Sequence, residues 1–363
     1  MTRRNADKPL MITTFCLLLF GMLVIFSAGF VLSMNNYGQP YYFFFHQLYF
    51  GVIPGLIVWF IAQNINYKIW ERIAFPLFLL VLGLLMAVFI PGLGENYQGS
   101  TRWLNLGPIN VQPTEIAKLA VILYLSAWLS KREQKIKDFT EGFLPFFAVI
   151  LVMAVLIIKQ PDIGTLGIIV IISVTIFFLA QGRLAHLLLL IMIGLLSLYL
   201  LIVFAPYRMA RFTVFLNPET DPRGIGYQIN QALIAIGSGG FWGNGLGLGR
   251  QKFLYLPEPI GDSIFAIICE ELGMIGGFLV VLLFLIIAWR GYLITKRAQD
   301  TFARLVAGGI TTWFVFQAFI NIAAITSLIP LTGIPLPFIS YGASALIVSL
   351  VGTGILLNIS KQS

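Results

Sequence analysis

Residues 263–289 read SIFAIICEELGMIGGFLVVLLFLIIAW, and this stretch decides the fold. Its only charged residues are Glu270 and Glu271, and it is longer than the roughly 20 residues that a helix needs to cross a bilayer core. The whole chain has the same character: 58% of its 363 residues are hydrophobic and 10% are charged. Because soluble domains carry about 25% charged residues, the sequence predicts an integral membrane protein.

Ten apolar stretches of this kind predict an all-α, polytopic membrane protein that forms a single domain over residues 1–363. Several of them are interrupted by glycine or proline. The stretches are residues 10–32, 44–63, 72–91, 113–130, 142–158, 163–181, 184–205, 263–289, 303–325 and 339–360.

The Lys and Arg residues orient these helices. With the N-terminus inside, the cytoplasmic segments hold 15 of the 23 basic residues, and the opposite orientation would export all of them. Both termini are therefore predicted to be cytoplasmic. The net charge of +8 follows from this asymmetry and suits anionic lipid, so it does not indicate nucleic-acid binding. The segments are 1–9, 64–72, 131–141, 182–186, 290–304 and 361–363.

This orientation leaves two prominent extracytoplasmic loops, residues 92–112 and 206–262. The second is long, shows no obvious secondary structure in its sequence, and carries aromatic residues that we expect to pack on the membrane face. Its segment 237–249, GSGGFWGNGLGLG, has seven glycines. Two interpretations stay open: a backbone that approaches a phosphate closely, and a flexible or re-entrant connector. The spacing matches neither a dinucleotide motif nor a P-loop.

Asp262 stands at the end of this loop, directly before the stretch 263–289. A carboxylate at the mouth of a membrane helix is costly, so a functional role is its default interpretation, and a helix N-cap is the alternative. Glu115 and Lys118, three residues apart in an apolar stretch, form either a functional pair or a structural ion pair. Asp162 has the same two interpretations as Asp262.

The sequence contains no recognisable metal-binding motif. Cys16 and Cys269 fall in different predicted helices, towards opposite membrane faces, and His46 and His186 are isolated along the chain. This spacing excludes a disulfide and a zinc site.

A series of short blocks resembles the SEDS family of cell-wall polymerases, whose members are FtsW, RodA and SpoVE. The blocks follow one another in the family's order over about residues 10–360, and the segment 329–342 is closest to the FtsW branch. Pro259–Ile260–Gly261 and Ser263 depart from the family pattern. The blocks include STRWL (100–104), QPTEIAKL (112–119), QPDIGT (160–165), YLPE (255–258), DSIFA (262–266), EELG (270–273) and PLPFISYG (335–342).

The resemblance implies a glycosyltransferase that polymerises lipid II at the outer face of the plasma membrane, with release of undecaprenyl pyrophosphate. It gives Asp262 the role of the base that accepts the proton of the attacking sugar hydroxyl. Cations are expected to neutralise the leaving pyrophosphate, and other polar side chains to bind or position the lipid headgroup. The cations are Arg102, Lys118, Arg211 and Lys252, and the other groups are Glu115, Asp162, Gln228, Glu258, Ser340 and Tyr341.

The resemblance also implies partners and a location. The expected partners are a class B penicillin-binding protein, which is a transpeptidase, and other components of the division machinery at the septum. The sequence assigns no cofactor; a Mg²⁺ or Mn²⁺ ion held by the pyrophosphate is the candidate, with its protein ligands unknown. The alternatives are a RodA-type polymerase for cell elongation and a lipid II flippase, since helices with buried charges also describe transporters. A non-enzymatic scaffold that recruits a transpeptidase is a further alternative.

Overall fold

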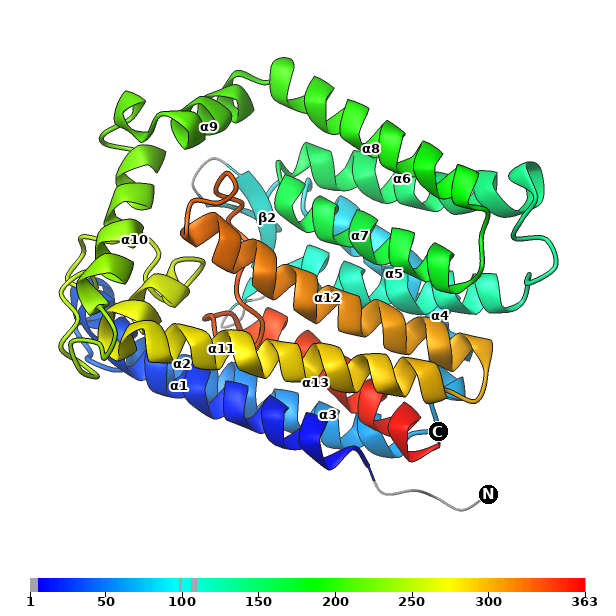
Figure 1. The fold of residues 1–363 in the computed structure, drawn as a ribbon, viewed down its shortest axis with the longest axis horizontal. Coiled ribbons are helices and arrows are strands. Elements are labelled where there is room, and N and C mark those ends of the chain that lie inside the picture. Colours follow the sequence, from blue (N-terminus) through cyan, green and yellow to red (C-terminus); the bar gives the residue numbers. More distant parts are fainter. Residues whose placement is uncertain (1–5, 98–99, 106, 108–109, 363) are drawn as a thin grey trace.

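The computed structural model describes residues 6–97, 100–105, 107 and 110–362, and most of its helices run roughly parallel or antiparallel in one bundle (Figure 1). All ten apolar stretches of the sequence form helices. In chain order the helices are α1 (Lys8–Tyr37), α2 (Tyr42–Gln47), α3 (Ile53–Asn64), α4 (Lys68–Ala87), α5 (Pro113–Ser130), α6 (Leu144–Lys159), α7 (Ile163–Leu179), α8 (Leu184–Val203), α9 (Pro206–Leu216), α10 (Ile225–Gly239), α11 (Ile264–Arg297), α12 (Thr301–Ile325) and α13 (Ala343–Lys361).

Among the described residues, eight helical stretches are long and apolar enough to cross a membrane. One of them is continuous from Tyr42 to Asn64, because a π-helical turn (Leu48–Val52) joins α2 to α3. The apolar helix α7 has only 17 residues, and α5 carries Glu115 and Lys118 within its 18. The chain is thus a multi-pass membrane protein.

The two predicted external loops contain secondary structure that the sequence analysis did not anticipate. In the first loop, β1 (Gly94–Tyr97), β2 (Ser100–Asn105) and β3 (Asn110–Val111) form a small antiparallel sheet in the order β1-β2-β3. The second loop contains α9 and α10. Residues 240–263, between α10 and α11, form a series of turns that ends at Asp262.

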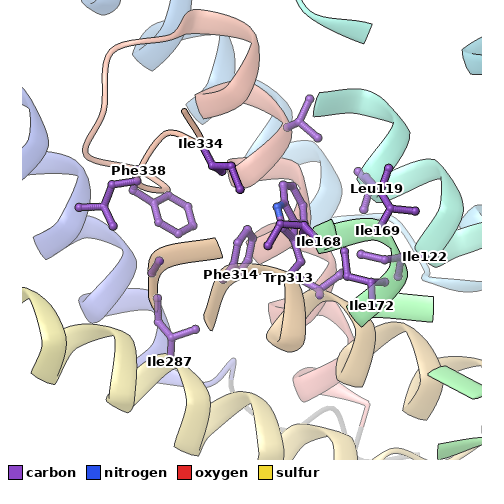
Figure 2. Packing of buried hydrophobic residues seen from close by; sticks show 14 of the residues in the cluster. Leu119, Ile122, Ile168, Ile169, Ile172, Ile287, Trp313, Phe314, Ile334 and Phe338 are labelled. Atoms are coloured by element: carbon purple, nitrogen blue, oxygen red, sulfur yellow. The ribbon is translucent and has the colours of Figure 1, made fainter. Parts of the chain in front are cut away.

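The helices α12 and α13 form the centre of the bundle. In the most apolar 18-residue stretch of each, 67% and 89% of the residues are buried. Close-up, Trp313 and Phe314 of α12 lie among apolar side chains of neighbouring segments (Figure 2). Trp313 faces the side of α5 and α7, and Phe314 faces the loop residue Phe338 with ring centroids 5.0 Å apart. The central helix therefore contacts both the core and the loop 328–342, which precedes α13.

Helix α11 is bent near its start. Gly273 has φ +66° and ψ −163°, which is not helical, and a Cβ atom there would lie 2.4 Å from both Gly243 N and Phe241 O. Only glycine adopts this conformation readily. The bend makes room for the turns that follow α10, and so it sets how the second external loop approaches the membrane helix.

Candidate active site

Asp262 lies at the point where the second external loop enters α11, and it is half-buried. The helix begins at Ile264, its N-cap residue is Ser263, and no side chain caps it. The carboxylate of Asp262 therefore does not cap the helix, and the N-cap interpretation is wrong for this residue.

The backbone around Asp262 is held by three donors from other parts of the chain. The carbonyl of Ile260 accepts from the backbone N–H of Tyr341 at 2.8 Å, and the carbonyl of Gly261 accepts from Ser340 Oγ at 2.7 Å. The carbonyl of Asp262 itself accepts from Asn321 Nδ2 at 2.8 Å. Three successive carbonyls thus have fixed partners in the loop 328–342 and in α12, which fixes the path of the chain that carries the carboxylate.

The carboxylate faces a small group of polar side chains. Gln228 on α10 donates to Asp262 Oδ1 at 3.5 Å and to Ser263 Oγ at 3.1 Å. Arg211 on α9 donates to the carbonyl of Leu331 at 3.3 Å and is close enough to interact electrostatically with Asp262. Glu258 lies one turn of the loop earlier and adopts a left-handed backbone, with φ +50°. Of the predicted site residues, Gln228 therefore contacts Asp262, and the charges of Arg211 and Glu258 act on it.

This environment changes the acidity of Asp262. Burial, and then the negative charge of Glu258, raise the pKa of Asp262 to about 7. The hydrogen bond from its own backbone N–H, the charge of Arg211 and the hydrogen bond from Gln228 oppose this with smaller effects. A carboxyl group with a pKa near neutrality exchanges a proton readily at physiological pH, which is what a general base requires.

Ser340 and Tyr341 have structural partners beside the site. Besides its bond to Gly261, Ser340 Oγ accepts from the N–H of Leu336 at 2.8 Å. The hydroxyl of Tyr341 is 2.8 Å from His46 Nδ1, so His46 is not isolated in the folded chain. These bonds position the loop around Asp262, and the role of Ser340 and Tyr341 in substrate binding stays a prediction.

Arg102 and Asp162 lie in a second cluster, at the junction of β2 with the turn between α6 and α7. Arg102 donates to the carbonyls of Gln160 and Pro161, and its guanidinium is 4.0 Å from Asp162. Asp162 accepts from the N–H of Thr165 at 3.3 Å and caps α7, as its alternative interpretation held. These contacts fix the turn, and they occupy Arg102 with protein acceptors.

Glu115 and Lys118 form a buried ion pair inside the bundle. Lys118 Nζ lies 2.8 Å from Glu115 Oε1, and both side chains are 1% exposed. Lys118 also donates to Gln317 Oε1 at 2.6 Å and lies 5.1 Å from the centroid of the Trp313 ring. The geometry fits the structural interpretation of the pair, and it places Lys118 in contact with α12.

Lys252 belongs to a third cluster, beside the bend of α11. Its Nζ lies 2.7 Å from Glu271 Oε1 and 3.1 Å from Ser27 Oγ on α1. The neighbouring Glu270 accepts from the backbone N–H groups of Arg250 and Gln251. These bonds attach the loop before Asp262 to α1 and α11, and the charge of Lys252 is balanced there by Glu271.

The glycine-rich segment 237–249 packs against the same bend. The N–H of Asn244 donates to the carbonyl of Glu270, and the N–H of Gly245 donates to that of Glu271, at 3.0 and 2.9 Å. A Cβ at Gly239 or Gly243 would lie 1.9 or 2.2 Å from a carbonyl oxygen of α11. The close approach that these glycines permit is thus to the backbone of α11, which favours the connector interpretation.

Comparison with known proteins places the chain in a family. The family model for FtsW, RodA and SpoVE, described as a cell cycle protein, matches residues 8–363. The chain belongs to the FtsW/RodA/SpoVE family. It is 42% identical over 361 residues to stage V sporulation protein E of Bacillus subtilis, covering 99% of this chain and 98% of that protein. It is 40% identical over 354 residues to the probable peptidoglycan glycosyltransferase FtsW of Trichlorobacter lovleyi, covering 98% and 93%.

Solved structures share the fold of this FtsW/RodA/SpoVE family member. A chain from a peptidoglycan synthase complex, described as coordinating polymerization and crosslinking, matches with a TM-score of 0.79 at 23% identity and 98% coverage of both chains. The rod shape determining protein RodA of Thermus thermophilus matches with a TM-score of 0.71 at 23% identity, covering 98% of this chain and 97% of that one. The predicted SEDS membrane fold is confirmed.

Two residues of this family member were missed by sequence reasoning, Gln317 and Asn321. Both lie on α12, are nearly fully buried, and contact the loop that frames Asp262. A signal for them exists in the sequence: Trp313, Gln317 and Asn321 recur every four residues and form a polar stripe on one face of an otherwise apolar helix.

Proposed function

We propose that this chain is a peptidoglycan glycosyltransferase that polymerises lipid II into glycan strands at the outer face of the plasma membrane. Relatives at about 40% identity over nearly their whole length carry that enzymatic name. The observation that carries the proposal is the site itself. The carboxylate of Asp262 lies where the second loop enters α11, does not cap that helix, and has a pKa of about 7.

The geometry supports a simple reaction. The hydroxyl of one lipid-linked sugar attacks the anomeric carbon of another, the bond from that carbon to the pyrophosphate oxygen breaks, and the hydroxyl proton goes to Asp262. Pyrophosphate leaves readily once its charge is neutralised, so one base suffices and a pair of acid and base carboxylates is not needed.

Arg211 is the cation best placed to neutralise the leaving pyrophosphate. Of the four basic residues predicted for this role, it is the one whose charge acts on Asp262. Arg102 is engaged with Asp162 and two carbonyls, Lys118 with Glu115, and Lys252 with Glu271. A preorganised guanidinium near the developing charge stabilises the transition state, and the position of Arg211 beside Asp262 supports this role for it.

The proposal includes a divalent cation that binds the pyrophosphate and neutralises its charge. The described residues include no group of three His, Cys, Asp or Glu side chains arranged to hold a metal. Oxygen ligands suit Mg²⁺ or Mn²⁺, and the pyrophosphate of the substrate would supply them. The ion would add further neutralising charge.

In the cell, we propose that the enzyme acts in septal wall synthesis, with a class B penicillin-binding protein as its partner. It is supported by relatives named FtsW and by the similarity to a synthase complex that combines polymerization with crosslinking. A RodA-type role in elongation is the second candidate, because the fold is also similar to that of RodA.

Purified protein, with its transpeptidase partner and labelled lipid II, tests the proposal. We expect glycan strands from the wild type and near-complete loss of them with Asp262→Asn, which keeps the size of the side chain and removes the base. Glu219→Gln, an exposed position in the same external segment, is the matched control and should retain activity. Polymer synthesis by Asp262→Asn at more than a small fraction of the wild-type rate would refute the assignment of the base.

A further inference from the structure

Two amide side chains on α12 contact the site from the interior of the bundle. Gln317 and Asn321 are one helical turn apart and are 2% and 1% exposed. Gln317 Nε2 donates to the carbonyl of Pro335 at 2.8 Å. Asn321 Nδ2 donates to the carbonyls of Ile334 and Asp262, each at 2.8 Å. Two successive loop carbonyls and the carbonyl of Asp262 are thus bound to one face of one helix.

The orientation of each amide follows from its partners. Gln317 Oε1 receives Lys118 Nζ at 2.6 Å and Trp313 Nε1 at 2.7 Å. Both of these groups are donors only, so the oxygen of Gln317 must face them and its nitrogen must face Pro335. The two acceptors of Asn321 are carbonyls, so its nitrogen must face them. Lys118 and Trp313 therefore determine which way Gln317 points.

The loop between α12 and α13 needs such external support. It contains Pro330, Pro335 and Pro337, which lack a backbone N–H, and residues 330–336 have no regular secondary structure. In Figure 2, Ile334 and Phe338 of this loop project toward Trp313 and Phe314 of α12. Apolar packing holds the loop against the helix, and the two amides set its position along the helix axis.

Packing alone does not account for an asparagine at position 321. Its Oδ1 atom is buried and has no hydrogen-bond partner among the described residues. Burying a polar atom without a partner is unfavourable, and an apolar side chain of similar size would avoid that cost. What the amide provides, and an apolar side chain would not, is two donated bonds that join Asp262 to the loop.

We propose that Asn321 is a positioning residue for Asp262, and that Lys118 affects the reaction through Gln317 and the loop, without touching substrate. The inference rests on the proposed function, since it takes Asp262 as the base. The ion pair of α5 fixes Gln317, Gln317 and Asn321 fix the loop, and the loop together with Asn321 fixes the peptide that carries the carboxylate. Small displacements of a catalytic group lower turnover strongly while leaving substrate binding nearly unchanged.

The test compares Asn321→Leu with Thr311→Val in purified, folded enzyme. Thr311 lies on the same helix, and the hydrogen bond that its hydroxyl donates stays within α12, to the carbonyl of Ala307. We expect Asn321→Leu to lower kcat by roughly 10- to 100-fold, to change KM for lipid II little, and to move the pH midpoint of the rate away from the wild-type value. Thr311→Val should retain the wild-type kcat and pH midpoint.

Ser340→Ala provides a second route, because it removes another donor to the same segment with the loss of a single atom. It should lower kcat in the same manner, and its effect should be non-additive with that of Asn321→Leu, since the two residues bind the adjacent carbonyls of Gly261 and Asp262. If Asn321→Leu does not fold, Ser340→Ala and Gln317→Leu carry the test by the same readouts.

The outcomes separate this inference from the proposed function. A wild-type kcat and pH midpoint in folded Asn321→Leu, with Asp262→Asn inactive, would overturn the positioning role and leave the base assignment intact. Activity in Asp262→Asn would overturn the base assignment itself. A rise in KM at unchanged kcat would show that Asn321 acts in substrate binding, and would also contradict the positioning role.

Discussion

At the scale of single residues, the site is defined by how each charge is balanced. Lys118 and Lys252 have buried carboxylate partners, and Arg102 has carbonyls and Asp162. Asp262 differs, because its nearest charged neighbours include another carboxylate, Glu258, as well as Arg211. The ion pairs are satisfied within the protein, whereas Asp262 retains a proton affinity suited to catalysis.

The pH dependence of the rate follows from this environment. The base must be deprotonated, so the rate should rise with pH through about 7, the pKa to which burial and Glu258 raise Asp262. Glu258→Gln removes the raising charge and should move the midpoint to lower pH, whereas Arg211→Gln removes a lowering charge and should move it to higher pH. Rate profiles of the detergent-solubilised variants, each scaled to its own maximum, measure both shifts, with Glu219→Gln as the control. Shifts in the reverse directions would show that another group controls the profile.

The buried pair on α5 leads to a prediction about stability. Lys118→Met leaves Glu115 buried without its cation and should destabilise the fold by about 3–5 kcal/mol. The double variant Lys118→Met with Glu115→Gln removes both charges and should recover much of that loss. Thermal unfolding in detergent measures Lys118→Met, Glu115→Gln and the double variant. If the double variant is as unstable as the sum of the single variants, the two residues do not act as a pair.

At the scale of elements, α11 combines the site with its support. Its first residues follow Asp262, its bend at Gly273 receives the turns after α10, and Glu270 and Glu271 bind the loop and Lys252. The glutamates lie in a membrane helix, yet each one has a partner, as buried charges require. The loop before Asp262 is therefore fixed at both ends.

The bend at Gly273 can be tested with a matched glycine. Gly273→Ala places a Cβ against two backbone atoms of the facing turn and forces a backbone conformation that costs about 1–3 kcal/mol for other residues. We expect a clear loss of thermal stability and of activity. Gly194→Ala, in α8 where nothing lies within 4 Å of the added atom, should be neutral or slightly stabilising. Equal effects of the two changes would show that the bend is not needed.

The elements also show what the sequence could predict. Ten apolar stretches became helices because length and hydrophobicity alone determine a membrane-spanning helix. The sheet in residues 92–112 and the helices α9 and α10 were not predicted, because they are short and lack a long apolar run. The structure brings Arg211, Gln228 and Glu258 near Asp262, whereas the predicted site residues Arg102, Lys118 and Lys252 lie in three other clusters. The sequence could not show this, because the partners of these cations come from distant segments or from the bend of α11.

At the scale of the whole molecule, the basic loops and Asp262 lie at opposite ends of the bundle. The start of α1 and the end of α13 lie at one end, and α11 begins at the other, near α10 (Figure 1). The basic segments 131–141 and 290–304 are predicted to be cytoplasmic, and they connect helices at the end where α1 starts. Asp262 lies at the opposite end, which the same prediction makes the outer one, whereas a transporter site is expected near the middle of the membrane.

An experiment in detergent can distinguish a polymerase from a flippase. A transferase that binds both lipid substrates at one face moves nothing through the protein. Glycan synthesis should therefore persist in detergent, where no bilayer separates two compartments. The activity should depend on Arg211, because departure of the pyrophosphate needs neutralisation, and Arg223→Gln, an exposed basic residue of the same external segment, should leave it unchanged. The matching assay follows labelled lipid II in liposomes. If the protein with its transpeptidase partner makes no glycan in detergent but moves lipid II between leaflets, the polymerase proposal is wrong and the transporter takes its place.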